Sequence, residues 1–214
     1  MVNPDIRQYV ETEILPRYAH FDAAHRVDHA QTVIRNSLEM AIHYDVNTDM
    51  VYVTAAYHDT GLIEGRERHH IASGNIIRAD KQLTRWFDET QIAIMADAAE
   101  DHRASSKHEP RTIYGKIVAE ADRCIDPETI IRRTIQYGLS HYPELDKEGN
   151  YLRTTEHMRE KYAEGGYLKL WIPESPNKQR LDELRKIFKN KEQFRKIHSR
   201  LYDEEKRQIS IHPK

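Results

Sequence analysis

The sequence predicts an all-α fold, and three observations support this prediction. Apolar residues recur at helical spacing in nearly every segment of the 214-residue chain. Residues 1–140 contain no alternating strand pattern, and the chain has no internal repeat. Residues that favour helix starts precede several segments: Asn3 with Pro4, Asn47 or Thr48, and Pro127. We therefore expect a helical bundle with a C-terminal helical extension.

Each helix expected in the first part of the chain has its own pattern. Residues 30–44 place Val33, Ile34 and Leu38 largely on one side, which is typical of an amphipathic helix. Residues 47–59 form an apolar run that ends in His58 and Asp59, which indicates a buried helix. The other expected helices cover residues 3–15, 68–87, 89–102, 112–124 and 127–142.

The character of the sequence changes after residue 142. Residues 143–151 are typical of a turn, with Gly149 and Asn150 at its end, and a helix is expected to follow over residues 152–164. The stretch "YLKLW" fits an extended segment or a helical turn, and residues 180–207 predict a charged, amphipathic pair of helices. We expect residues 1–142 to form the main domain and residues 143–214 to pack on it as an extension.

Composition restricts the class of protein and its partners. The formal net charge of −2 gives no overall preference for nucleic acid or membranes. Cys124 is the single cysteine, so no internal disulfide can form. No apolar run is long enough to span a membrane, and the N-terminus lacks a signal-peptide core. We therefore expect a cytoplasmic protein that binds neither membranes nor a nucleic acid duplex; its oligomeric state stays open, with a homo-oligomer among the options.

Histidines and aspartates at helix ends are the candidates for chemistry. His58 and Asp59 end the buried helix, and a carboxylate is costly to bury without a partner. Similar positions, at helix ends or beside apolar stripes, hold His29, His69, His70, His102 and Asp122. Imidazole and carboxylate together suit divalent Mn, Fe, Co, Ni or Zn. Spacing alone also allows hydrogen-bonded core histidines and capping aspartates.

The order of these residues resembles the HD superfamily of metal-dependent phosphohydrolases. "AAYHDTG" is similar to that family's "LLHDIG" element, and "YGKIVAEADR" is similar to its "EKIxxxAD" element. The resemblance covers roughly residues 20–140. It implies a helical HD domain in which His29, His58, Asp59 and Asp122 bind one metal ion.

Two further matches resemble the binuclear members of this family. "HIASG" matches with His70 and Gly74, and "EDHRAS" matches with His102, so the resemblance implies six ligands in the order H…HD…H…H…D. His69 competes with His70 for the fourth position. Leu62 stands where binuclear hydrolases often have a phosphate-holding lysine, so other cations must hold phosphate. No "GYP" element follows His102, which disfavours cyclic-dinucleotide hydrolysis.

The resemblance implies hydrolysis of a phosphoric ester or anhydride in a nucleotide or another small phosphorylated metabolite, with one or two divalent transition metals as cofactors. Asp59 is the candidate bridging ligand between two ions. The candidate phosphate-binding cations are Arg26, Arg103, Lys107 and Arg123, each with an ordinary surface role as the alternative. Arg103 and Lys107 follow His102 in a polar loop and are the candidates for a catalytic role. Glu64 and Glu67 are candidates for a base, against solvated residues at a helix start.

Two other functions fit the same residues. Some HD-fold proteins with six such ligands hold a mixed-valent di-iron pair and cleave C–C or C–P bonds with O₂. The other alternative is a non-catalytic protein in which the metal stabilises the fold and the charged tail binds a partner. Iron content and O₂ uptake separate the oxygenase from the hydrolase, and an open coordination position counts against a purely structural metal.

Overall fold

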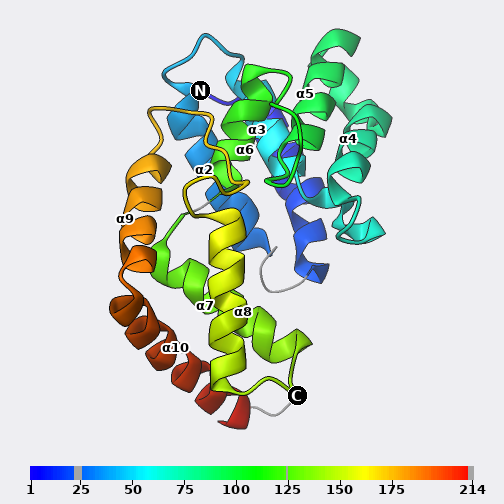
Figure 1. Cartoon of the computed structure of the whole chain (residues 1–214). Coiled ribbons are helices and arrows are strands. Elements are labelled where there is room, and N and C mark those ends of the chain that lie inside the picture. Colours follow the sequence, from blue (N-terminus) through cyan, green and yellow to red (C-terminus); the bar gives the residue numbers. More distant parts are fainter. Residues whose placement is uncertain (22–25, 124, 212–214) are drawn as a thin grey trace. The chain divides into compact units, whose positions relative to one another are not determined.

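The structure is a computed structural model that describes residues 1–21, 26–123 and 125–211, and it confirms the all-α fold (Figure 1). No strand occurs within these ranges. The chain divides into two compact units: Met1–Cys124 with Leu170–Ser175, and Ile125–Lys169 with Pro176–Lys214. The expected boundary after residue 142 lies elsewhere, because α7 packs with α8, α9 and α10. Cys124 lies outside the described residues.

The two units have separate sets of helices. The first unit contains α1 (Pro4–Tyr9), η1 (Val10–Ile14), η2 (Leu15–His20), α2 (Val27–Ala41), α3 (Thr48–Tyr57), η3 (Thr60–Glu64), α4 (His69–Ala79), η4 (Lys81–Arg85), α5 (Glu89–Asp101) and α6 (Ile113–Asp122). The second contains α7 (Pro127–His141), α8 (Lys147–Lys161), α9 (Asn177–Lys189) and α10 (Lys191–Ile211). Labels beginning with η mark short 3₁₀ helices, except η1, which is a π-helix.

Helix α3 is the centre of the first unit. All of its residues from Met50 to Tyr57 are buried, and it packs against α2, α5 and α6. The Asn47 side chain accepts hydrogen bonds from the backbone N–H groups of Asp49 and Met50 and so begins the helix. Because α3 is buried on every side, the residues that follow it emerge inside the unit.

Two glycines allow close helix contacts beside the end of α3. A Cβ atom on Gly61 would lie 2.1 Å from the carbonyl oxygen of His69 and 2.4 Å from the nitrogen of Ser73. A Cβ atom on Gly74 would lie 2.7 Å from the side chain of Glu100. The contacts of η3 with α4, and of α4 with α5, therefore depend on residues that lack a side chain. Figure 1 shows α4 and α5 side by side.

A strap formed by Leu170–Ser175 completes the first unit. Glu120 is fully buried in α6 and accepts hydrogen bonds from the backbone N–H of Trp171 and the hydroxyl of Ser175, both at 2.7 Å. The Tyr44 hydroxyl donates to the Glu174 carboxylate at 2.6 Å. The strap therefore supplies partners for a buried carboxylate that has been removed from water.

Some element boundaries differ from the predicted ones. The single helix expected over residues 68–87 is wrong: α4 ends at Ala79 and η4 begins at Lys81. The Asp80 side chain accepts a hydrogen bond from the Gln82 backbone N–H and thereby starts the new helix. It also accepts bonds from the hydroxyls of Tyr9 and Tyr57, each at 2.6 Å.

The turn expected to end at Gly149 and Asn150 is shorter than predicted. Helix α8 already begins at Lys147, because Asp146 accepts a hydrogen bond from the Gly149 backbone N–H. Residues 167–171 are not helical, which decides between the two structures that the sequence left open. The expected pair of charged helices is confirmed as α9 and α10. None of the helices in the described ranges is long and apolar enough to cross a membrane.

Candidate metal centre

Four predicted ligands from three parts of the first unit meet where α3 ends. The Nε2 atom of His29, from α2, lies 3.3 Å from Nε2 of His58 and 3.5 Å from Oδ2 of Asp59. Nε2 of His58 lies 3.2 Å from the same Asp59 oxygen. Oδ1 of Asp122, at the end of α6, lies 3.3 Å from His29 Nε2 and 3.8 Å from His58 Nε2. We call these four residues the first site.

A second group forms around the other oxygen of the same carboxylate. Oδ1 of Asp59 lies 3.4 Å from Nε2 of His69 and 3.4 Å from Nε2 of His102. The two histidine nitrogens are 3.2 Å apart. His69 is the first residue of α4 and His102 directly follows α5, so the Gly61 and Gly74 contacts bring them together. We call Asp59, His69 and His102 the second site.

Backbone carbonyls orient three of the four histidines. The Nδ1 atoms of His58, His69 and His102 lie 2.7, 2.7 and 2.6 Å from the carbonyl oxygens three residues earlier. A carbonyl oxygen only accepts hydrogen bonds, so Nδ1 carries the proton and the neutral ring has its lone pair at Nε2. All three lone pairs therefore point into the two sites, which is the arrangement expected of metal-binding histidines.

The donor set fits a divalent transition metal. Lone pairs and carboxylate oxygens face one another at 3.2–3.8 Å in a place where His58 is 0% and Asp59 3% exposed. Donor atoms that bind one ion at about 2 Å lie roughly 3 Å from one another, which matches these separations. Imidazole nitrogen and carboxylate oxygen suit Mn, Fe, Co, Ni and Zn. The identity and number of the ions stay predictions.

The electrostatics of both sites favour a bound cation. Burial raises the pKa of Asp59, but its close contacts with the imidazoles of His58, His102 and His29 outweigh the burial and hold that pKa well below its usual range. Asp122 is shifted in the same direction despite its burial, chiefly by its hydrogen bond with His29. Burial lowers the pKa of His29, but its hydrogen bonds to Asp122 and Asp59 raise it to about 10. The two carboxylates therefore remain ionised at neutral pH and attract positive charge.

The preference for His70 over His69 was wrong for the position beside Asp59. His69 lies in the second site, whereas Nδ1 of His70 is buried without a hydrogen-bond partner in the described part of the chain. Adjacent residues of a regular helix point about 100° apart, and at the start of α4 this rotation turns the His69 side chain, rather than that of His70, toward Asp59. The prediction depended on the spacing to Gly74, but Gly74 serves the packing of α4 on Glu100 of α5.

Tyr18 is a supporting residue that the sequence analysis missed. Its buried hydroxyl donates to the carbonyl oxygen of Ala56 at 2.8 Å and accepts from the backbone N–H of Asp59 at 3.3 Å. The phenol thus fixes the backbone at the point where α3 ends and the bridging carboxylate begins. Nothing in the local sequence marks Tyr18, because its contact with this region spans 38 residues.

The loop after His102 is held at its base by ion pairs. Asp101 is buried and accepts bonds from the Arg111 backbone N–H at 2.7 Å and from its Nε at 3.1 Å. Arg111 also donates to Glu100 at 2.7 Å. Residues 103–112 contain no helix, which confirms the predicted loop. The acidic pair directly before His102 was the available sequence signal for this anchor.

The four predicted phosphate-binding cations have different surroundings. Arg103 donates from Nη1 to the carbonyl oxygen of Glu67 at 2.7 Å, which joins the loop to the segment before α4. Arg123 is half-buried and donates to the carbonyl oxygens of His102, at 3.3 Å, and Ala119. Arg26 and Lys107 are exposed, and their side chains make no hydrogen bond or ion pair within the described ranges. Their roles in phosphate binding stay predictions.

The remaining predicted site residues lie in η3 and in the segment that joins it to α4. Glu64 and Glu67 are exposed at the end of η3 and in the segment that follows, and no carboxylate contact joins them to the six histidines and aspartates in the described structure. Leu62 is half-buried in η3. The backbone carbonyl of Glu67, rather than its carboxylate, contacts Arg103.

Comparisons with known proteins place this centre in a family. Residues 26–125 match the family model of the HD domain, and this segment contains all six residues of the two sites. A crystal structure of a predicted HD superfamily hydrolase from an uncultured Thermotogales bacterium is similar, with 21% identity and a TM-score of 0.48, over 71% of this chain and 82% of that one. A comparison with curated proteins found no match.

The family match and the site agree on the same part of the molecule. The matched segment begins just before α2, which carries His29, and ends just after α6, which carries Asp122. The histidine–aspartate pair that gives the family its name is His58–Asp59, at the end of the buried central helix. Residues 26–125 of this chain are therefore an HD domain.

Proposed function

We propose that this protein is a metal-dependent phosphohydrolase that acts on a nucleotide or another small phosphorylated metabolite through a binuclear centre. The observation that carries the proposal is the division of Asp59 between two sites. Oδ2 lies with His29 and His58, and Oδ1 lies with His69 and His102. A carboxylate placed in this way is suited to bridge two ions.

The chemistry of such a centre suits phosphoryl groups. Divalent metals, when bound in pairs, act as Lewis acids on phosphoryl oxygens and lower the pKa of water. The ligands His29, His58, Asp59 and Asp122 would hold one ion, and Asp59, His69 and His102 the other. The carbonyl bonds to three of the rings fix their Nε2 lone pairs before any ion arrives, so the ligands need little rearrangement.

Arg103 is the best-placed candidate for holding a phosphate. Arg103 directly follows His102, and its side chain bonds to Glu67, two residues before His69, so it lies between the two segments that carry the histidines of the second site. One N–H of Arg103 donates to Glu67, and the others make no hydrogen bond in the described structure. Guanidinium N–H groups can bind two phosphate oxygens at once. With Leu62 in place of a phosphate-holding lysine, this residue is the proposed substitute.

A screen for phosphate release tests the proposed function. The purified protein is reconstituted separately with Mn, Fe, Co, Ni and Zn and assayed with nucleotides, dinucleoside polyphosphates and small phosphorylated metabolites. We expect release in at least one combination and its loss in Asp59→Asn, because an amide cannot supply two anionic oxygens to the centre. His70→Gln serves as a matched control, since His70 lies beside the second site without contributing to it.

Two results would contradict the proposal. If the iron-loaded protein consumes O₂ and releases no phosphate from any compound, the di-iron oxygenase is the better description. If the protein retains metal but Asp59→Asn leaves phosphate release unchanged, the activity does not arise at this centre.

A further inference from the structure

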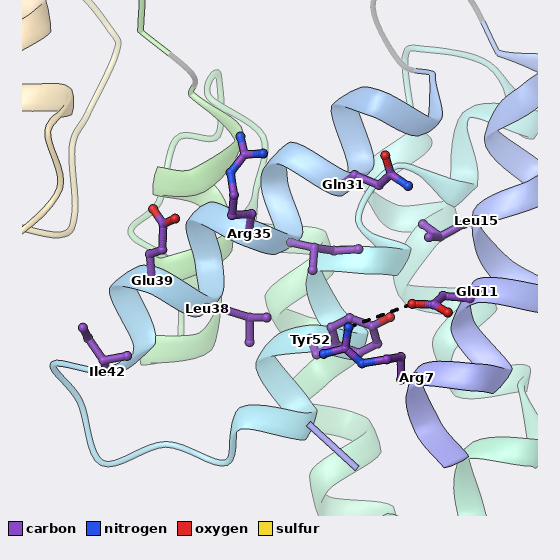
Figure 2. Close-up of a pocket in the computed structure, with 10 residues that line it drawn as sticks. Arg7, Glu11, Leu15, Gln31, Arg35, Leu38, Glu39, Ile42 and Tyr52 are labelled. Atoms are coloured by element: carbon purple, nitrogen blue, oxygen red, sulfur yellow. Dashed lines mark ion pairs between the residues drawn. The ribbon is translucent and has the colours of Figure 1, made fainter. Parts of the chain in front are cut away.

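An apolar groove lies on the first unit between η1, α2 and α3. Its volume is about 590 Å³, and Figure 2 shows the residues that line it. Leu15, Ile34 and Tyr52 form a buried floor, with exposed fractions of 7, 8 and 3%. Leu38 extends the apolar surface as a half-buried side chain of α2. None of these residues belongs to the metal centre.

A protruding apolar side chain stands at the end of the same groove. Ile42, which follows the last residue of α2, is 78% exposed and is part of the groove lining. The groove is therefore a hollow with an apolar knob beside it. Removing an exposed isoleucine side chain from water is favourable, so a surface that covers Ile42 is stabilised by the contact.

The rim of the groove carries two positive and two negative charges. Arg7 pairs with Glu11 at 4.0 Å on the side of α1 and η1. Arg35 and Glu39 extend from the same side of α2, and neither has an ion pair in the described ranges of the chain (Figure 2). The net charge of this rim is zero, so it selects neither a strongly acidic nor a strongly basic partner.

The arrangement along α2 is complementary to itself. Successive residues of an α-helix are rotated by 100°, so the residues of α2 that line the groove cover about 140° of the helix surface. Leu38 and Ile42 lie near the middle of this face. Arg35 and Glu39 lie along one edge of it. If a second α2 lies antiparallel to the first with a twofold axis at Leu38, Ile42 of each copy lies over Ile34 of the other. The axial offset between Arg35 and the opposite Glu39 is then about 3 Å, within the reach of both side chains.

We propose that this protein forms a homodimer through α2, in which Ile42 of each chain occupies the groove of the other. A twofold interface requires one surface to match itself, and this face offers a knob next to a hollow and opposite charges one helical turn apart. The Arg35 and Glu39 side chains, which have no ion pair among the described residues of one chain, form two equivalent ion pairs across the axis. The second copy is therefore the occupant whose shape and charge the groove fits.

Sedimentation or light scattering on the full chain tests the dimer. The wild-type protein is expected to be a dimer, and Ile42→Glu should raise the dimer dissociation constant at least about tenfold because it places a carboxylate in an apolar groove. Ile63→Glu is a matched control: Ile63 is also 78% exposed but lies in η3, outside the groove, so its dimer should be unchanged.

A charge exchange tests the register of the two helices. Arg35→Glu alone should weaken the dimer, since each Glu39 then faces a carboxylate of the other chain, and Arg35→Glu combined with Glu39→Arg should restore it. A monomeric wild-type protein would overturn the proposal. So would a dimer that tolerates both Ile42→Glu and Arg35→Glu, because its interface would then lie on another surface or involve another partner segment.

Discussion

At the scale of single residues, three backbone carbonyls orient the rings of three of the four histidines in the metal centre. Each accepts the Nδ1 proton of a ring three positions later and so leaves the Nε2 lone pair toward the sites. This device needs no special neighbouring side chain, because the last turn of α3 and of α5 supplies the acceptors for His58 and His102. A histidine at a helix end is therefore oriented by the helix itself.

The assignment of His69 leads to a test on adjacent residues. In His69→Gln the second site loses one of its three side chains, so we expect one bound Mn²⁺ per chain in place of the two proposed for the wild type. In His70→Gln both ions should be retained, because His70 Nε2 and Nδ1 are outside the sites. Metal analysis after reconstitution and desalting gives the count. Equal loss of metal in the two variants would show that the side chains of both residues support the second site.

Arg103 can be tested separately from the metal ligands. If the substrate is a phosphate ester, Arg103→Ala should lower transition-state stabilisation by about 1–3 kcal/mol, the range for a hydrogen bond to a charged group. Metal content should stay intact, since Arg103 contacts Glu67 rather than a ligand. Steady-state kinetics with Arg103→Lys as the comparison measures the value of the planar guanidinium. Unchanged kinetics would move the phosphate-binding role to Arg26 or Arg123.

Candidate site residues were predictable from the sequence where a charged or titratable side chain follows a buried apolar helix. A buried His58–Asp59 pair after an apolar helix requires a partner whatever the fold. The choice between His69 and His70 was not predictable, because it depends on the rotation of α4, which the Gly61 contact sets. The role of Tyr18 could not be predicted from the sequence either, because its hydroxyl contacts the Asp59 backbone only in the folded chain.

At the scale of elements, backbone contact between η3 and α4 determines where the second site forms. The Gly61 N–H donates to the Ser73 hydroxyl at 2.9 Å, and the missing side chain allows the His69 carbonyl to approach. Asp59 precedes this contact by two residues and His69 begins α4, so one contact positions both sides of the second site. Helix packing and the geometry of the second site are thereby coupled.

Gly61→Ala should damage both the fold and the site. Its Cβ would meet backbone atoms that cannot rotate away, so α4 must shift, and we expect a loss of about 1–3 kcal/mol in the free energy of unfolding. Occupancy of the second site should fall with it. Chemical denaturation and metal analysis measure the two effects.

Gly65→Ala is the matched control for this substitution. Gly65 has φ +97° and no atom within 4 Å of an added Cβ, so the cost there is backbone strain without a collision. Metal occupancy should therefore stay at the wild-type value in Gly65→Ala. If Gly61→Ala binds metal as well as Gly65→Ala does, the close approach is not what positions His69.

Helix existence was predictable because apolar periodicity is a local property, whereas the break at Asp80 was not. Residues 68–87 have a continuous helical pattern, but the Asp80 carboxylate accepts bonds from Tyr9 and Tyr57. These partners lie 71 and 23 residues away. Long-range hydrogen bonds of this kind override local helix preference.

At the scale of the whole molecule, the second unit contains its own buried titratable group. His198 in α10 is 1% exposed and bonds to the Asn150 side chain at 3.0 Å through Nε2. Burial, with the charges of Lys147 and Arg195, lowers its pKa to about 4. A neutral His198 is therefore part of the packing between α8 and α10.

This shift predicts an acid-sensitive second unit. The unfolded chain binds the proton first, near pH 6.5, so stability should fall as the pH drops from about 6.5 toward 4, by up to about 3 kcal/mol. Hydrogen exchange of α8 and α10 amides at pH 7 and 4.5 measures the change after correction for intrinsic rates. His198→Gln, which keeps a neutral donor for Asn150, should be less sensitive, and the exposed His141→Gln should behave as the wild type. Equal acid sensitivity in all three proteins would exclude His198 as the cause.

The division into units was only partly predictable. The change of composition after residue 142 marks the charged second unit approximately, but α7 has the same helical pattern as the helices before it. The assignment of the strap to the first unit depends on Glu120, whose partners are 51 and 55 residues away. The local sequence "YLKLWIPES" does not indicate that this segment binds the Glu120 carboxylate.

The strap also has a consequence for synthesis of the chain on the ribosome. When α6 leaves the exit tunnel, Glu120 has neither Trp171 nor Ser175 to bind, because both are still untranslated. At about 5–20 residues per second, several seconds pass before they appear, and all of α7 and α8 must emerge in between. The nascent HD domain therefore carries an exposed edge at α6 during this interval, and an early termination product ending before residue 170 would keep that edge and become a target for chaperones or proteases.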